Sequence, residues 1–335
     1  MKKRVIWLDI IKIIACFLVI VNHSGLYIFK FTNTTTSHIF YSINFAFCKL
    51  AVPAFIMASG AVFLKRKTTY KDMLKKIFRF AVPLIIISLI SYVHHSGDYN
   101  IFNFSKAFLK DRILGPYWYL YMLIALYLLT PFIKKMVDNF DNKDNIYFII
   151  LTLIIPTFLK MVSYYTKIEI SSYFFESCIP ETIGLFVSGY YISNIKKNKK
   201  IFIASIITLI ITLISFVFSV YVPFTKTGAF DYKFGTYNSF FAIVEALCLF
   251  YIIKHYFENK NIKCEKVINE ISLCTFGIFL FHYPAIDRFF YMSIMQKIFA
   301  FNPYIGTYTL QITVFITTGL ITYLLRKIPI IKKFL

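Results

Sequence analysis

Four side chains capable of chemistry recur along the first apolar stretch of the chain: Asp9, Lys12, Cys16 and His23. Lys12 and His23 are eleven positions apart, and eleven steps of about 100° bring an α-helix to within about 20° of three full turns. Asp9 and Lys12 form an i,i+3 pair, which also shares a face. The spacing therefore predicts one polar stripe, with Lys12 and His23 about 16 Å apart along the helix axis.

The histidine of this stripe is suited to proton transfer, because an ordinary imidazole has a pKa of about 6.5 and accepts a proton at neutral pH. His23 is therefore a candidate general base. A histidine can also accept an acyl group covalently, and the sequence leaves both routes open. Asp9 could orient or neutralise Lys12. Taken singly, these residues also fit a structural ion pair and a hydrogen-bonded core histidine, but their shared stripe favours a polar pathway.

A second basic pair, Lys76 and Arg79, stands at the entrance to another apolar stretch. The i,i+3 spacing puts both on one helix face, and cations at a helix entrance can hold phosphate groups that arrive from the cytosol. The alternative is that the pair only anchors its helix at the membrane surface. Arg79 lies deeper in the stretch, so anchoring explains it less well.

Three further ionisable residues lie within apolar stretches: Glu181, Glu245 and His282. An ionisable group is costly inside a membrane, so each is a candidate for a functional contact, although a structural hydrogen bond explains each one taken alone. Glu245 lies in mid-stretch, and we expect it to have a buried partner. Trp118 stands in an aromatic cluster of the kind found at membrane interfaces.

The elements that must position these residues are transmembrane helices. Hydrophobic residues make up 58% of the 335 residues and charged residues only 16%, against about 45–50% and about 25% in soluble domains. This composition excludes disordered, collagen-like and disulfide-scaffold proteins. We expect an all-α polytopic bundle in one integral membrane domain, residues 1–335. Its ten expected spans are residues 5–28, 42–64, 77–93, 117–133, 145–162, 178–195, 201–222, 237–254, 269–290 and 305–326.

The basic residues give the expected orientation. The net charge is +21. If the chain crosses the membrane at each expected span, 24 Lys and Arg residues fall in segments on the same side of the membrane as the N-terminus, against eight in segments on the opposite side. Cytoplasmic loops carry such an excess, so both termini are expected in the cytoplasm. The clusters would then face anionic membrane lipids. No basic patch suggests nucleic acid, and the six cysteines form no CxxC pair, so no metal site is expected.

The order of these motifs resembles the membrane-bound acyltransferase-3 family, which includes bacterial surface-polysaccharide O-acetyltransferases. Its first-span pattern, a basic residue followed eleven positions later by His, is met by Lys12 and His23. Its pair of basic residues three apart is met by Lys76 and Arg79. The family often has Arg at the positions of Lys12 and Lys76, and Lys lacks the bidentate geometry of Arg. Further segments that resemble the family are residues 52–60 (VPAFIMASG), 117–131 and 279–284 (FLFHYP).

The resemblance implies a standalone O-acyltransferase of a bacterial cell membrane, without the extracytoplasmic SGNH-type hydrolase domain of many relatives. The donor would be cytosolic acyl-CoA, with acetyl-CoA the first choice, used as a co-substrate without any tightly bound cofactor. The acceptor would be a hydroxyl of a cell-surface or lipid-linked glycan. The expected catalytic residues are His23, Asp9 and Lys12, the donor-binding residues are Lys12, Lys76 and Arg79, and the substrate-binding residues are His282, Glu181 and Trp118.

Two other classes of protein remain open on the sequence alone. A glycan transporter or flippase would also have many spans and a polar stripe. It would more typically show paired broken helices in corresponding halves, and the sequence contains no such pair. A non-catalytic assembly partner is the other alternative. The sequence does not define the acceptor glycan, the acyl group or the oligomeric state.

Overall fold

The computed structural model describes residues 5–66, 69–171, 180–228 and 235–335, and it confirms the all-α prediction. The structure is 83% helical, and no strand occurs in these ranges. Some residues that were counted above lie outside the described ranges. Among the basic residues they are Lys2, Lys3, Arg4, Lys67 and Lys233, and Cys178 and the first two residues of the expected span 178–195 also lie outside.

The helical elements follow one another without intervening sheets. In chain order they are α1 (Ile6–Ser24), η1 (Gly25–Lys30), α2 (Thr35–Cys48), α3 (Ala51–Phe63), α4 (Tyr70–Ser96), α5 (Ile101–Lys110), η2 (Gly115–Tyr117), α6 (Trp118–Asp138), α7 (Asn142–Ile149), η3 (Ile150–Ile154), α8 (Ile155–Thr166), α9 (Glu181–Asn194), α10 (Lys199–Thr227), α11 (Phe240–Phe257), α12 (Glu265–Phe290), α13 (Ser293–Phe301), α14 (Pro303–Leu325) and α15 (Pro329–Lys332).

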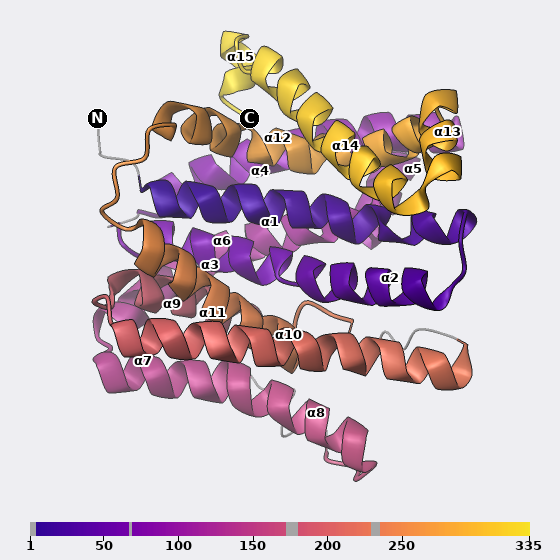
Figure 1. The fold of residues 1–335 in the computed structure, drawn as a ribbon. Coiled ribbons are helices and arrows are strands. Elements are labelled where there is room, and N and C mark those ends of the chain that lie inside the picture. The colour runs from indigo at the N-terminus through magenta and orange to yellow at the C-terminus, as the bar shows by residue number, and fades with distance from the viewer. Residues whose placement is uncertain (1–4, 67–68, 172–179, 229–234) are drawn as a thin grey trace.

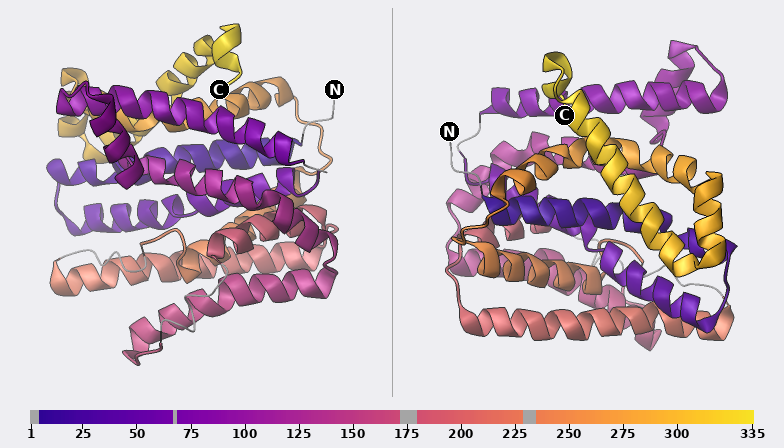
Figure 2. Two further views of the ribbon diagram at one scale, coloured as in Figure 1. Left: turned by 180° about the vertical axis from the view of Figure 1, so that it is seen from behind. Right: turned by 45° about the horizontal axis from the view of Figure 1, so that its top comes forward.

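Helix α1 crosses the middle of the bundle, with α10 on one side and α14 on the other (Figure 1). It packs against α2, α3, α11, α12 and α14, so its polar side chains face protein on most sides. The start of α1 and the end of α14 lie toward one end of the bundle, and α13 lies at the opposite end (Figures 1 and 2). We call the end at which α1 begins the proximal end, and the other the distal end.

Eight helical segments in the described residues are long and apolar enough to cross a membrane. The other two expected spans are helices that do not meet both conditions. Helix α9 has only 14 residues, about 21 Å, whereas the hydrocarbon core is about 30 Å thick. Helix α12 has 26 residues, but it includes Glu265, Lys266 and Glu270 near its start and Asp287 and Arg288 near its end. Eight of the ten expected spans therefore correspond to helical segments of the described residues that qualify by length and apolarity, and α9 and α12 do not.

A short turn between α2 and α3 contains the cation Lys49. Helix α2 ends at Cys48 and α3 begins at Ala51, so Lys49 lies in the turn between them. Pro53 explains the break, because it has no N–H to donate to the carbonyl of Lys49 and its ring would clash there in a continuous helix.

Helices α3 and α9 approach each other closely at two glycines. A Cβ added to Gly60 would overlap the backbone of Phe186, and one added to Gly189 would overlap the backbone of Met57. Small residues allow such approach between membrane helices.

Replacing either glycine should therefore destabilise the bundle. We expect Gly60→Ala or Gly189→Ala to lower the free energy of unfolding by about 1–3 kcal/mol, the usual cost of overpacking. Thermal unfolding of the purified protein in detergent would measure this as a lower melting temperature. Gly319→Ala is the matched control, because its Cβ would lie at an ordinary 3.5 Å from Ile278. Equal melting temperatures for Gly60→Ala and Gly319→Ala would contradict the close approach.

Candidate active site

A cavity of about 220 Å³ opens beside the first half of α1. Lys12 lines it, with Ser59 of α3, Tyr127 of α6 and Thr275 of α12. Most of the remaining lining is aliphatic or aromatic. We call it the proximal cavity, because it lies on the stretch of α1 near its start. It is an apolar chamber with one cation in its wall.

Lys12 is held by the residue that the sequence pairs with it. Its Nζ lies 3.5 Å from Oδ1 of Asp9, and the same oxygen accepts a hydrogen bond of 2.6 Å from the Ser272 hydroxyl. Asp9 is only 2% exposed. The carboxylate therefore compensates the charge of Lys12 and ties α1 to α12.

The structure directs the second basic pair to different partners. Nζ of Lys76 lies 3.6 Å from the centre of the Phe63 ring, and that ring lines the proximal cavity. Nη2 of Arg79 donates to the carbonyl oxygen of Leu335 at 2.8 Å. The side chain of Phe80, the neighbour of Arg79, lines the cavity. Lys76 and Arg79 thus stand beside the proximal cavity rather than in its wall.

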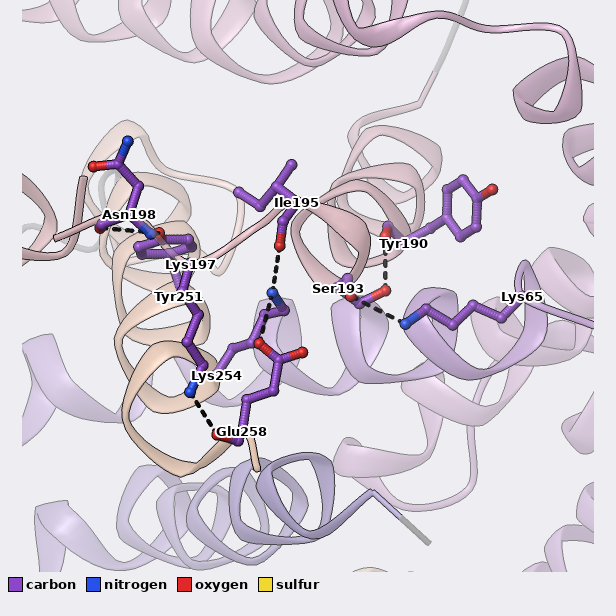
Figure 3. Close-up of polar contacts among 9 residues, drawn as sticks. All are labelled: Lys65, Tyr190, Ser193, Ile195, Lys197, Asn198, Tyr251, Lys254 and Glu258. Atoms are coloured by element: carbon purple, nitrogen blue, oxygen red, sulfur yellow. Dashed lines mark hydrogen bonds and ion pairs between the residues drawn. The ribbon is translucent and has the colours of Figure 1, made fainter. Parts of the chain in front are cut away.

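Other lysines at this end stabilise helix ends (Figure 3). Lys65 donates to the carbonyl of Ser193 at 3.0 Å, and Lys254 donates to that of Ile195 at 2.6 Å. Lys254 also pairs with Glu258 at 3.2 Å. Burial and the nearby Lys254 ammonium lower the pKa of Lys65, an effect that Glu258 opposes. Lysines that bond the last carbonyls of a helix have a structural role, so Lys65 and Lys254 are poor candidates for ligand binding.

A second cavity, of about 190 Å³, lies beside the last part of α1 and is called the distal cavity. His23 lines it together with Asn22, Lys49 and Trp118. The Trp118 ring stacks on that of Tyr237, with 4.9 Å between ring centres. The expected stripe on α1 therefore reaches two chambers, with Lys12 in one and His23 in the other.

Hydrogen bonds around Asn22 define the state of His23. Lys49 Nζ at 2.8 Å and Cys48 Sγ at 3.3 Å both donate to Oδ1 of Asn22. Two donors on this oxygen assign the other amide atom, Nδ2, to the side that faces Nε2 of His23 at 3.4 Å. An amide NH₂ only donates, so Nε2 must be the acceptor. A neutral His23 then carries its proton on Nδ1 and keeps Nε2 as its basic atom.

His282 lies behind His23 and is not part of the wall of either cavity. It is 0% exposed. The centres of the two imidazole rings are 5.4 Å apart, and Nδ1 of His282 donates to the carbonyl of Phe279 at 2.6 Å. The structure thus brings the two histidines together, but only His23 faces open space.

The two glutamates lie outside the lining of both cavities. Glu181 pairs with Lys160 at 3.1 Å at the start of α9. Glu245 is fully buried in α11. The partner expected for it is not found, because neither of its carboxylate oxygens has a hydrogen-bond partner in the described part of the chain.

Two polar residues of the distal cavity that bond to each other, Asn22 and Lys49, were not candidates from the sequence. Asn22 stands next to His23, but a neighbour in sequence points to a different side of a helix. Lys49 lies in the turn before α3, and its side chain contacts Asn22 of α1. The signal that could have identified it is Pro53, four residues later, which predicts an interruption of the helix at Lys49.

The family comparison supports an enzyme. The acyltransferase domain of the acyltransferase-3 family matches residues 5–326, nearly the whole chain, and the chain belongs to this family. Searches of curated proteins and of solved structures gave no match. The motif resemblance noted in the sequence is therefore confirmed at the level of the family.

The tautomer of His23 can be measured directly. In protein labelled with ¹⁵N-histidine, NMR should show that His23 at neutral pH carries its proton on Nδ1 and that its Nε2 is unprotonated. Asn22→Leu removes the donor to Nε2 and should give a mixture of tautomers. Asn44→Leu is the control, since the Asn44 amide donates to Phe40 instead. A His23 that is protonated on Nε2 in the unmodified protein would contradict the assignment.

Proposed function

We propose that this membrane acyltransferase moves an acyl group, acetyl in the first instance, from cytosolic acyl-CoA to a hydroxyl of a cell-surface or lipid-linked glycan. One observation carries the proposal: α1 places Lys12 in one cavity and His23 in another, and both cavities are lined by the same two residues, Tyr119 and Phe279. A cation suits an anionic donor, and an imidazole suits a hydroxyl acceptor. Family membership gives the reaction type.

The orientation follows from charge. The 24 basic residues on the N-terminal side, against eight on the other, support a cytoplasmic proximal end, with both termini inside. Acyl-CoA, a cytosolic polyanion, would then arrive beside Lys76 and Arg79, and its acyl end would extend past Lys12. The glycan would reach the distal cavity from the other face, where Trp118 forms part of the wall.

The proposed reaction is a direct transfer. When the glycan hydroxyl replaces the Asn22 amide as the donor to Nε2 of His23, Nε2 takes the hydroxyl proton while the hydroxyl oxygen attacks the thioester carbonyl carbon. The C–S bond then breaks, the ester forms, and the CoA thiolate leaves and takes up the proton that Nε2 of His23 had accepted, which restores the neutral imidazole. Lys49, in the same cavity, supplies positive charge for the oxyanion that develops on the carbonyl oxygen. Transfer through an acyl-histidine is the alternative route, and trapping of an acylated His23 by mass spectrometry would identify it.

A transporter or flippase for the same glycan is the alternative function. It needs no acyl donor, although a buried imidazole can also relay protons in a transporter. Acetyl transfer by the purified protein in the presence of acetyl-CoA separates the two functions. A protein that moves glycan across the membrane without consuming acetyl-CoA would favour the transporter.

His23→Ala should lower the rate of acyl transfer by about 10² to 10⁴, the usual contribution of general acid–base catalysis. Binding of acyl-CoA should be retained, because His23 lies in the distal cavity. His94→Ala is the control, since His94 is an exposed residue near the end of α4. Normal transfer by His23→Ala together with loss of transfer in His282→Ala would assign the base to α12 instead.

Lys76→Ala and Arg79→Ala should weaken acyl-CoA binding by about tenfold or more, as expected when a hydrogen bond to a charged group is lost. Increasing salt should reproduce part of the loss in the unmodified protein. Equilibrium binding of acetyl-CoA measures both effects. Lys143→Ala, which removes an exposed cation at the start of α7, is the control. Unchanged affinity in well-folded Lys76→Ala and Arg79→Ala proteins would show that these residues only anchor α4.

A further inference from the structure

Two aromatic rings stand between the cavities. Tyr119 of α6 and Phe279 of α12 line both of them, and their ring centres are 5.5 Å apart. On the proximal side the ring of Phe55 lies 6.1 Å from that of Tyr119. On the distal side the ring of Phe279 lies 5.6 Å from that of His282. Any group that moves from Lys12 to His23 inside the bundle must pass the Tyr119–Phe279 pair.

The backbones on both sides of this pair are fixed to each other. Pro284 leaves the carbonyl of Leu280 without its helical donor, and the hydroxyl of Tyr117 donates to that carbonyl at 2.9 Å. Tyr117 stands two residues before Tyr119, and Leu280 follows Phe279, so this bond joins the two backbones next to the rings. This bond holds the two backbones near each other, and we expect the pair to open by rotation of its side chains.

Packing also limits how far the rings can rotate. Tyr119 and Phe279 are each only 7% exposed, so apart from the two cavities each ring is surrounded by protein. Forcing extra methylenes into a packed site costs about 1–3 kcal/mol. A short acyl group extends only a little beyond the rings into the distal cavity, and each added methylene must find room there against Tyr119 and Phe279.

We propose that Tyr119 and Phe279 form a constriction that restricts the donor to short-chain acyl-CoA, and so determine the acyl specificity of the enzyme. This inference rests on the proposed acyl transfer and names the substrate class of the same site. The thioester lies at the constriction when its carbonyl reaches His23, so the part of the acyl chain beyond the carbonyl must fit the distal cavity. A long chain would remain on the proximal side, with its thioester out of reach of the imidazole.

The test compares kcat/KM for acetyl-, butyryl- and hexanoyl-CoA in purified full-length variants. The unmodified protein should prefer acetyl- over hexanoyl-CoA by at least about tenfold, the discrimination available from a few methylenes. Tyr119→Leu and Phe279→Leu, which widen the constriction from different helices, should each reduce that ratio severalfold. Phe276→Leu is the matched control, because Phe276 lines only the proximal cavity, and its ratio should stay unchanged.

A narrowing variant gives an independent check if a widened protein is unstable. Phe279→Trp should reduce acetyl transfer while acetyl-CoA binding is retained. Unchanged chain-length ratios in active Tyr119→Leu and Phe279→Leu proteins would overturn the constriction, as would equal use of acetyl- and hexanoyl-CoA by the unmodified protein. If the unmodified protein transferred no acyl group from any of the three donors, the proposed function itself would fail, which is a different result from an active enzyme with an unchanged ratio.

Discussion

The cost of placing charge inside an apolar bundle determines the arrangement of this protein. Asp9, Lys12 and His23 are all on α1, and none of them can face lipid without a large penalty. Protein therefore surrounds α1, which packs against α2, α3, α11, α12 and α14. The bond from Ser272 to Asp9 completes the burial of the ion pair and joins α1 to α12. The two cavities lie along this polar stripe, with Lys12 in the lining of one and His23 in the lining of the other.

The same stripe separates two kinds of chemistry along one axis. At Lys12 the surroundings are apolar and the one cation is paired with Asp9, which suits the acyl end of a donor whose phosphates would lie beside Lys76 and Arg79. At His23 the Lys49–Asn22–His23 hydrogen-bond chain fixes which nitrogen is basic. The Tyr119–Phe279 pair stands between the two. Prolines contribute to both features: Pro53 explains the break that returns Lys49 to α1, and Pro284 exposes the carbonyl that holds Tyr117.

Much of the fold and one side of the site could be predicted from the sequence. Spacing along a single helix is sufficient to pair Asp9 with Lys12, because i,i+3 residues are neighbours in any α-helix. Spacing cannot show which residue of another helix comes near, so Lys49 and the Tyr119–Phe279 pair emerged only from the structure, as did the contacts that Asn22 of α1 makes with Lys49 and His23. Hydropathy also overestimated the number of clear spans, since α9 is short and buried against α3. A window of apolar residues cannot distinguish such a buried helix from a membrane-spanning one.

The proposed path from a cytoplasmic donor site to His23 is tested most directly by measuring from which side of the membrane the donor is used. Sealed inside-out and right-side-out vesicles from cells that produce the protein would be supplied with radiolabelled acetyl-CoA, and label in the glycan and glycolipid fraction would be counted. His23→Ala membranes would provide the background. Label is expected in inside-out vesicles, whose cytoplasmic face is open to the donor, and only background label in intact right-side-out vesicles. Equal labelling of both preparations, or labelling of right-side-out vesicles alone, would contradict a path along α1 from a cytoplasmic donor site to His23.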